Sequence, residues 1–303
     1  MKKILITGKN SYIGNAVAAY LEEYSASENT GCALYQVEKL SLRGEDWKTA
    51  DFSGYDTILH VAGMAHADVS KVSEETKQLY YQINAELPAR VAKKAKAEGV
   101  KQFIHLSSVI VYGDSAGVGK EKMITADTIP HPSSFYGDSK LKGEEKLQAI
   151  CSEDFKVAIL RLPMVCGKGS KGNYPILAKM AGKTPVFPNI RNKRSMIYIE
   201  NLAEFIRLLA EKGCGGLFFP QNEEYVITAR MVQLIGVAKG KKVRLWGVLN
   251  PFVWLASKLP GGVGALANKA FGSLTIEQGL SGHDEYAYQK YSLEESIGRI
   301  HED

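Results

Sequence analysis

A tyrosine and a lysine four residues apart, Tyr136 and Lys140, follow an upstream serine, Ser108, in a combination that suits acid–base chemistry. A phenol, an ammonium and a hydroxyl can together move a proton on and off a carbinol oxygen while a nicotinamide carries the hydride. Residues four apart share one helix face, so the Lys140 ammonium would lie beneath the Tyr136 phenol. A positive charge there favours phenolate, and we therefore expect a lowered pKa for Tyr136.

A tyrosine and a lysine four residues apart are common in proteins. The pair therefore indicates a nicotinamide-dependent enzyme only if a nucleotide-binding segment occurs earlier in the chain. Residues 3–7 (KILIT) form a short apolar run that predicts a buried parallel strand, and residues 8–14 (GKNSYIG) lead into a helical pattern. A strand, a tight turn and a helix in that order direct free backbone N–H groups at a pyrophosphate. Ser11 replaces the middle glycine of the usual fingerprint, and its hydroxyl would donate to a phosphate oxygen. A glycine-rich turn without a ligand is the alternative.

Composition indicates a globular enzyme without a metal or disulfide framework. The 303 residues are 45% hydrophobic and 23% charged, and the net charge of +5 is scattered, which gives little support to a nucleic-acid partner. Cys32, Cys151, Cys166 and Cys214 are isolated and lack a histidine at ligand spacing, so we expect no metal and reduced, cytoplasmic thiols.

Two apolar stretches are too short to cross a membrane. The N-terminal run ends at Thr7-Gly8, before a signal-peptide core could form, and the run from Leu245 to Leu259 is interrupted by Asn250, Pro251 and Lys258. We expect the second run to be a packing helix or an interface, with Trp246 and Trp254 buried. Peripheral membrane contact is the alternative for this segment, and stacking on a base is the alternative role for its tryptophans.

Strand and helix patterns alternate in the first half of the chain, which predicts βαβ units and a parallel sheet. We place strands at residues 3–7, 34–42, 57–61, 102–107 and 156–161, and helices near 12–24, 75–97, 135–151 and 174–181. Ser133 or Ser134 would cap the third helix. The pattern loosens after about residue 163. We therefore expect an α/β fold in which residues 1–165 form a doubly wound, dinucleotide-binding domain. Residues 166–303 would form mainly a smaller substrate lobe, with some later segments returning to the first domain.

Several weak motifs in a fixed order make the chain resemble the extended short-chain dehydrogenase/reductases, in particular their NAD(P)-dependent sugar-nucleotide epimerase/dehydratase group. The resemblance covers almost the whole chain. It rests on Thr7-Gly8 with Gly14, Asp51-Phe52, residues 60–63 (HVAG), Asn84, Ser108 with residues 111–113 (VYG), Tyr136 with Lys140, residues 161–163 (RLP) and residues 194–202 (RSMIYIENL).

The resemblance implies a set of cofactor contacts. The residues lining the pyrophosphate would be Gly8, Ser11, Tyr12, Ile13 and Gly14, and those contacting adenine would be Asp51 and Phe52. His60, Ala62 and Gly63 would border the adenosine ribose and the phosphates, although a hydrogen-bonded core histidine explains His60 equally well. Lys140 would also bind the nicotinamide ribose, and the backbone of Pro163 to Val165 the carboxamide.

The end of the second strand bears on the choice between NADP and NAD. NAD-specific relatives tend to place an acidic residue there for the ribose hydroxyls, whereas this chain has Ser41 and Arg43, which could accept a 2′-phosphate. We therefore favour NADP(H). Glu38 would supply the acid, and NAD would become the cofactor, if the strand ended earlier.

The same resemblance implies a substrate site in the second lobe. Arg194 matches an arginine that the family uses on the nucleotide diphosphate, and Asn173 is a candidate polar contact, with a plain surface loop as the alternative for each segment. Tyr136 would be the acid/base, Lys140 would tune the phenol and position the ribose, and Ser108 would hydrogen-bond the sugar oxygen. Alternation along a strand would send Ser107 to the opposite face.

The favoured reaction is hydride transfer at C4 of a UDP-hexose. The leading interpretation is a 4-ketoreductase for a UDP-4-keto-6-deoxy-hexosamine type of sugar, and the alternative is a UDP-sugar 4-epimerase that retains NAD. A dehydratase would need an Asp-Glu pair after the catalytic hydroxyl, where this chain has Val109 and Ile110. A nonenzymatic dinucleotide sensor is the remaining alternative. We also expect a possible homodimer through the helix that runs from Tyr80 to Ala97.

Overall fold

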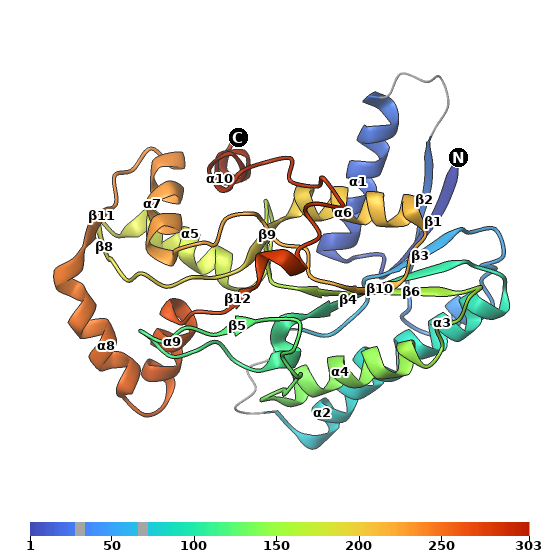
Figure 1. Cartoon of the computed structure of the whole chain (residues 1–303), viewed down its shortest axis with the longest axis horizontal. Coiled ribbons are helices and arrows are strands. Elements are labelled where there is room, and N and C mark those ends of the chain that lie inside the picture. Colours follow the sequence, from blue (N-terminus) through green and yellow to red (C-terminus); the bar gives the residue numbers. More distant parts are fainter. Residues whose placement is uncertain (28–33, 66–71, 303) are drawn as a thin grey trace.

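The computed structural model describes residues 1–27, 34–65 and 72–302, and its centre is a six-stranded parallel sheet (Figure 1). The strand order is β10-β6-β4-β3-β1-β2. The bounds are β1 Lys2–Thr7, β2 Tyr35–Leu40, β3 Thr57–His60, β4 Gln102–Ser108, β6 Lys156–Leu162 and β10 Gly216–Phe218. This order confirms the α/β doubly wound class that the alternating pattern predicts.

The strands form where apolar runs are buried on both faces. All four residues of β3 are buried, as are six of the seven in β4 and β6. The register aligns Thr7 with His60 and His60 with His105, so β1, β3 and β4 end at one edge of the sheet. The carboxyl ends of parallel strands are where ligands bind in such folds.

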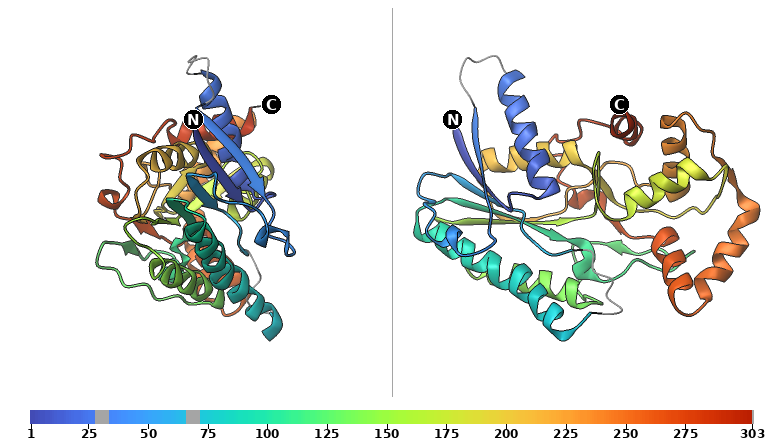
Figure 2. Two further views of the ribbon diagram at one scale, coloured as in Figure 1. Left: turned by 90° about the vertical axis from the view of Figure 1, so that its right-hand side faces the viewer. Right: turned by 180° about the vertical axis from the view of Figure 1, so that it is seen from behind.

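Helices cover both faces of the sheet, as Figures 1 and 2 show. On one face lie α1 (Tyr12–Ser27) and α6 (Ile199–Lys212), and on the other lie α2 (Glu74–Tyr81), α3 (Leu87–Ala97) and α4 (Phe135–Gln148). Ser134 caps α4 by accepting from the Gly137 N–H at 3.3 Å, as the sequence predicts.

A π-helical turn, Gln82–Glu86, interrupts the helix expected at residues 75–97. It presents Asn84 to α4, where the backbone passes so close that a Cβ built on Gly143 would lie 2.3 Å from the Asn84 carbonyl oxygen. Such turns occur often at functional sites, and this one directs a buried amide side chain toward the end of β3.

The remainder of the chain builds three two-stranded sheets and a group of helices. The strand pairs are β7 (Met164–Cys166) with β9 (Met196–Tyr198), β8 (Val186–Pro188) with β11 (Arg244–Trp246), and β5 (Met123–Ile124) with β12 (Thr275–Ile276). The helices are α5 (Asn173–Lys183), α7 (Thr228–Ala238), α8 (Asn250–Lys258), α9 (Gly262–Phe271) and α10 (Leu293–His301). Short 3₁₀ turns span Asp46–Lys48, Val109–Tyr112, Gly247–Leu249 and Gln278–Leu280.

All five predicted strands are present, with ends within two residues of those expected. From the second half of the chain, β10 completes the edge of the main sheet and α6 covers it, while the division at residue 165 stays a prediction. Among the described helices, none is long and apolar enough to span a membrane. Cys151, Cys166 and Cys214 are free thiols, and the described residues contain no cluster of metal ligands; Cys32 lies outside the described residues.

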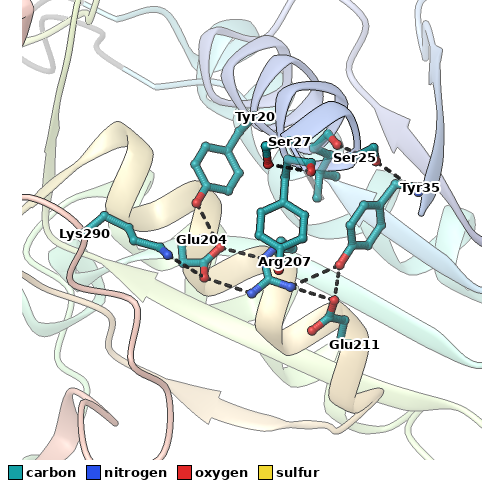
Figure 3. Close-up of polar contacts among 10 residues, drawn as sticks. Tyr20, Ser25, Ser27, Tyr35, Glu204, Arg207, Glu211 and Lys290 are labelled. Carbon is teal, nitrogen blue, oxygen red and sulfur yellow. Dashed lines mark hydrogen bonds and ion pairs between the residues drawn. The ribbon is translucent and has the colours of Figure 1, made fainter. Parts of the chain in front are cut away.

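A buried ionic network fastens α6 to α1 and β2 (Figure 3). Arg207 donates to Glu204 at 2.6 Å and to Glu211 at 2.6 Å, and its guanidinium carbon lies 4.1 Å from the centre of the Tyr24 ring. Tyr20 of α1 donates to the same Glu204 carboxylate at 3.0 Å. Because Arg207 and Glu204 are both buried, removing either one takes away the buried partner of the other and leaves it only a more exposed one, Lys290 for Glu204 and Glu211 for Arg207.

We therefore predict that Arg207→Ala lowers the free energy of unfolding by about 3 to 5 kcal/mol, the range for breaking a buried pair. The matched control is Lys212→Ala, which removes the exposed Lys212–Glu285 pair of the same helix and costs less than about 1 kcal/mol. Urea unfolding of both variants measures the difference. Equal losses for the two variants would contradict the role given to this network.

Candidate active site

The turn between β1 and α1 is shaped by close contact with the segment after β3. Gly8 has a φ of +120°, and a Cβ at this position would lie 2.9 Å from the Ala62 nitrogen. A side chain there would be strained in the backbone and would collide with Ala62. Gly14 is also confined, since its Cβ would lie 2.9 Å from Val61 Cγ2. Both glycines allow α1 to begin directly above the sheet edge.

Ser11 is the residue before α1 and caps the helix. Its Oγ accepts from the Gly14 N–H at 3.3 Å, which leaves the hydroxyl hydrogen able to donate. The N–H groups of Tyr12 and Ile13, in the first turn, have no acceptor within the described part of the chain. Free amides at a helix N-terminus suit a pyrophosphate, so the residues of this turn fit a dinucleotide.

The Tyr12 side chain is directed into the protein rather than toward solvent. Its hydroxyl is buried without a hydrogen-bond partner in the described residues, and a Cβ on Gly167 would lie 2.2 Å from it. Burial, with Cys166 and Glu200 nearby, raises the pKa of the Tyr12 phenol. Tyr12 therefore has its backbone N–H to offer a phosphate, while its ring packs against the segment after β7.

The end of β2 lies beside this turn and leaves two exposed side chains. Gly8 and Lys9 both donate their N–H groups to the Leu40 carbonyl, at 2.8 and 3.2 Å, so Ser41 and Arg43 follow at the same edge. Both are exposed, and the Arg43 N–H donates to Ser41 Oγ at 3.3 Å. Glu38 lies two residues before the strand end and accepts from the Tyr55 hydroxyl at 2.7 Å.

The two residues expected at adenine are oriented differently. The Phe52 ring is fully buried in the core beneath Lys94, whose ammonium lies 4.9 Å from the ring centre. This contradicts a contact of the ring with adenine, because the apolar side chain gains more from burial in the core. Asp51 is exposed, and its carboxylate accepts from the Ser53 N–H at 2.8 Å, which lowers the Asp51 pKa.

His60 is a buried, neutral histidine at the end of β3. Its Nδ1 shares a hydrogen bond of 2.9 Å with the Thr7 hydroxyl, and its ring stacks on His105 at 5.6 Å. Burial, and secondly the charge of Lys140, lowers the His60 pKa to about 3. The same causes hold His105 neutral. The positive charge in this part of the core therefore belongs to Lys140.

Lys140 is buried on α4 and faces the ends of β3 and β4. Its Nζ donates to the Leu106 carbonyl at 3.0 Å, and a Cβ on Gly63 would lie 3.1 Å from that nitrogen. Burial lowers the Lys140 pKa to about 8, while the nearby Glu144 carboxylate opposes this shift. A side chain at Gly63 would crowd the Lys140 ammonium. The neighbouring Ala62 contacts Gly8 through its backbone.

Ser108 and Tyr136 meet at the end of β4. Burial, and secondly the neighbouring Tyr80, raises the Tyr136 pKa to about 12, and a hydrogen bond with Ser108 partly offsets the increase. The expectation of a lowered pKa is therefore wrong for this structure. The Tyr136 pKa is raised because the phenol is desolvated and because Lys140 directs its ammonium to the Leu106 carbonyl.

Ser107 points the opposite way, as strand alternation predicts. It is buried and donates to Glu144, which in turn holds Arg161 through a contact of 2.6 Å. Arg161 also donates to the Tyr112 hydroxyl. This buried clamp ties α4 to β4 and β6, and it fixes the helix that carries Tyr136 and Lys140.

The structure adds Asn84 as a residue that holds the site together. From the sequence, Asn84 is only one of the residues that carry the family resemblance. Its amide accepts from the Met64 N–H at 2.8 Å and donates to Ser139 Oγ at 3.0 Å, so it joins the segment after β3 to α4. The tight Asn84–Gly143 approach is a long-range contact, and spacing in the sequence gives no sign of it.

The remaining predicted contacts lie on the second half of the chain. Pro163 separates β6 from β7, and Val165 pairs with Ile197 in the β7–β9 sheet. Asn173 is the first residue of α5. Arg194 donates to the Lys269 carbonyl at 2.6 Å and has no carboxylate partner among the described residues. Burial lowers the Arg194 pKa, and an anion would relieve that cost.

Comparison with known proteins decides the family. The sequence model of the NAD dependent epimerase/dehydratase family matches residues 4–227. The chain belongs to the NAD-dependent epimerase/dehydratase family. The resemblance to the extended short-chain dehydrogenase/reductases and the interpretation as an NAD(P)-dependent enzyme are thereby confirmed.

Similar proteins align over nearly the whole length of the chain. A UDP-glucose 4-epimerase of Vibrio cholerae is 28% identical over 295 residues, covering 93% of this chain and 86% of its own. A human epimerase family protein with NADPH has a TM-score of 0.73 at 16% identity, covering 99% of both chains. A UDP-glucuronic acid 4-epimerase of Bacillus cereus with NAD has a TM-score of 0.69 at 17% identity, covering 99% of this chain and 95% of its own.

Because the Lys140 ammonium is buried, the free energy of unfolding should depend measurably on pH. The Lys140 pKa is about 8 in the folded chain and 10.5 as an ordinary lysine, so between these values the unfolded chain binds more protons. Stability contributed by this site therefore rises with pH across that window. Relative to Lys140→Met, the wild-type free energy of unfolding should rise by up to about 3 kcal/mol between pH 8 and 10.5.

Urea unfolding at several pH values measures this difference. The matched control is Lys142→Met, two residues along the same helix, where the lysine side chain is half exposed. Its difference from wild type should stay flat across the window. A flat profile for Lys140→Met as well would show that the ammonium is not buried.

Proposed function

We propose that the protein is an NAD(P)H-dependent 4-ketoreductase of a nucleotide sugar, with Tyr136 as the proton donor. The observation that supports this most strongly is the partly buried Ser108–Tyr136 pair at the end of β4, with the buried Lys140 on the same helix as Tyr136. A phenol with a pKa of about 12 is protonated at neutral pH. A protonated acid is the form that the reduction of a ketone requires.

Each residue then has one part in the reaction. A bound nicotinamide would supply the hydride that adds to C4 of a keto sugar. Tyr136 gives its proton to the oxygen on that carbon, Ser108 hydrogen-bonds the same oxygen, and solvent returns a proton to the phenolate. Lys140 uses one donor on the Leu106 carbonyl and keeps two for the nicotinamide ribose.

The cofactor preference is proposed from the end of β2. Glu38 is engaged by Tyr55, whereas Ser41 and Arg43 are exposed where a 2′-phosphate would lie. The exposed Ser41 and Arg43 support NADP(H). However, β2 ends at Leu40, two residues earlier than expected, so the exposed Glu38 meets the condition stated for NAD, which remains the alternative cofactor. The cofactor would pass over Gly8, the amides of Tyr12 and Ile13, and the capping residue Ser11. Further proposed contacts are Gly14, Asp51, the Phe52 backbone, His60, Ala62, Gly63 and the backbone from Pro163 to Val165.

The substrate is proposed to be a nucleotide diphosphate sugar bound by Arg194. The Arg194 side chain is partly buried without a carboxylate partner among the described residues, and its planar donors suit paired phosphate oxygens. Asn173, at the start of α5, would add a polar contact from the loop that covers the sugar. The leading sugar is a UDP-linked 4-keto-6-deoxy-hexosamine. The choice of this sugar is based on the sequence resemblance alone.

A UDP-sugar 4-epimerase that retains NAD is the second candidate. It is supported by the Vibrio cholerae relative, which is named as such an enzyme and aligns over 93% of this chain. The two reactions share every residue named above, but they differ in what happens to the cofactor. A reductase releases oxidised cofactor after each turnover, whereas an epimerase returns the hydride and holds the dinucleotide.

We predict that Tyr136→Phe lowers kcat for ketone reduction by about 10²- to 10⁴-fold while changing KM little, because the proton donor acts in the transition state. The matched control is Tyr81→Phe, which removes a hydroxyl that donates to Asp138 on the outer side of α4. This control should keep its activity. Single-turnover oxidation of NADPH with a panel of UDP-4-keto sugars measures both variants. Undiminished turnover by Tyr136→Phe would refute the proposed proton donor.

Cofactor choice is tested separately at Arg43. We predict that Arg43→Ala raises the KM for NADPH by about tenfold or more, the loss expected for a charged hydrogen bond, and leaves that for NADH unchanged. Lys48→Ala, at another exposed cation after β2, is the control and should change neither value. Equal effects on both cofactors, or NAD that stays bound through purification, would favour the epimerase.

A further inference from the structure

The segment from residue 225 to residue 276 is unlike the rest of the chain in charge. It contains seven lysines and arginines and not one aspartate or glutamate. The segment therefore carries +7, and because the whole chain carries +5, the rest sums to −2. Charge of one sign over so long a stretch favours contact with anionic surfaces.

The same segment also exposes many large apolar side chains. Eight of the sixteen exposed large hydrophobic residues in the described chain belong to residues 246–266: Trp246, Val248, Phe252, Trp254, Leu255, Leu259, Val263 and Leu266. Phe252 is 67% exposed and Leu255 is 60% exposed. This finding contradicts the expected burial of Trp246 and Trp254; no residue of α8 is fully buried, and only Val253 on it packs against the core. An exposed apolar patch of this size marks a binding surface.

These residues form a helical hairpin, α8 and α9, at the end of the molecule farthest from β1 and β2 (Figures 1 and 2). The two helices approach closely, since a Cβ on Gly264 would lie 2.0 Å from the Leu259 carbonyl oxygen. Asn268 fastens them by donating to the Ser257 carbonyl at 3.0 Å. Val248, Phe252, Leu255 and Leu259 recur at helical spacing, so the hairpin displays an apolar stripe that is held in place.

Cations border the hairpin. Lys258 and Lys269 lie on its helices, and a surface hollow of about 530 Å³ precedes it, lined by Arg230, Lys242 and Arg244 among others. Arg230 contacts Glu294 at 3.6 Å, whereas Lys242 and Arg244 are exposed and have no carboxylate partner in the described residues. Tryptophans, aliphatic side chains and bordering cations are the features of a helix that lies in a membrane interface.

We propose that the α8–α9 hairpin docks the protein on the surface of an anionic lipid bilayer. Its apolar stripe would enter the headgroup region, and the surrounding lysines and arginines would lie against lipid phosphates. A second copy of the chain fits less well, because a twofold contact through this patch would bring two surfaces of like charge together. The proposal is independent of the reaction assigned above.

Docking would bring the substrate lobe to the bilayer. The end of α9 is joined to the segment before β9, where Arg194 donates to the Lys269 carbonyl at 2.6 Å and Asn192 to the Gly272 carbonyl at 3.2 Å. Two hydrogen bonds thus connect the base of the hairpin to the segment that carries Arg194, the residue proposed for the substrate diphosphate. A bilayer under the hairpin would lie next to the substrate side and away from the cofactor turn.

Flotation of the full chain with vesicles tests the proposal. We expect binding to vesicles of phosphatidylcholine with 30% phosphatidylglycerol, and at least tenfold weaker binding to phosphatidylcholine alone. The triple variant Phe252→Ser, Leu255→Ser, Leu266→Ser should lower anionic-vesicle binding at least tenfold, as should Lys242→Glu with Arg244→Glu. The controls are Ile129→Ser, at a residue 83% exposed elsewhere, and Lys93→Glu with Lys101→Glu. Both controls should bind as wild type.

Intrinsic fluorescence gives a test that needs no variant. Two of the three tryptophans, Trp246 and Trp254, lie on the patch, while Trp47 is buried. Anionic vesicles should shift the emission to the blue, and brominated lipid should quench it. Absence of binding and of this shift would overturn the proposal. So would a dimer that forms without vesicles and is lost in the triple variant, which would assign the patch to a second copy.

Discussion

The burial of one ammonium group, that of Lys140, sets the arrangement at the carboxyl ends of β1, β3 and β4. A charge in the core is costly unless its surroundings hold it, and here the Leu106 carbonyl and the Glu144 carboxylate do so. The two neighbouring histidines stay neutral, so they add no repulsion. Gly63 leaves room for the amine, and the π-helical turn brings Asn84 to the same place. A group kept in this way is available to a ligand without rearrangement of the core.

Buried polar contacts also hold the α4 helix, which carries Lys140, in place. Ser107, Glu144, Arg161 and Tyr112 form a buried chain of contacts behind the site, while Ser108 and Tyr136 face the other side. The alternation of two adjacent serines along β4 directs the Ser107 hydroxyl to Glu144 and the Ser108 hydroxyl to Tyr136. On the opposite face of the sheet, the Arg207 network anchors α6, so buried ion pairs fix the helices on both faces.

Much of the fold could be predicted from the sequence because it follows from local patterns, whereas the functional residues remain a prediction. Short apolar runs give the strands, and the spacing of Tyr136 and Lys140 gives a shared helix face. The pKa of Tyr136 could not be predicted, since it depends on burial and on where a flexible ammonium points. The buried ring of Phe52 and the exposed Trp246 and Trp254 also lie beyond local pattern, because residue type does not reveal which neighbours cover a side chain.

We propose that this edge of the sheet brings a nicotinamide and a sugar carbon together under a proton donor. Transfer of deuterium from C4-deuterated NADPH to a UDP-4-keto sugar, followed by NMR of the product, tests this arrangement. We expect deuterium on C4 of the sugar, with one oxidised cofactor released for each sugar reduced. A sugar that gains no deuterium while the cofactor remains reduced, across a panel of 4-keto sugars, would contradict it.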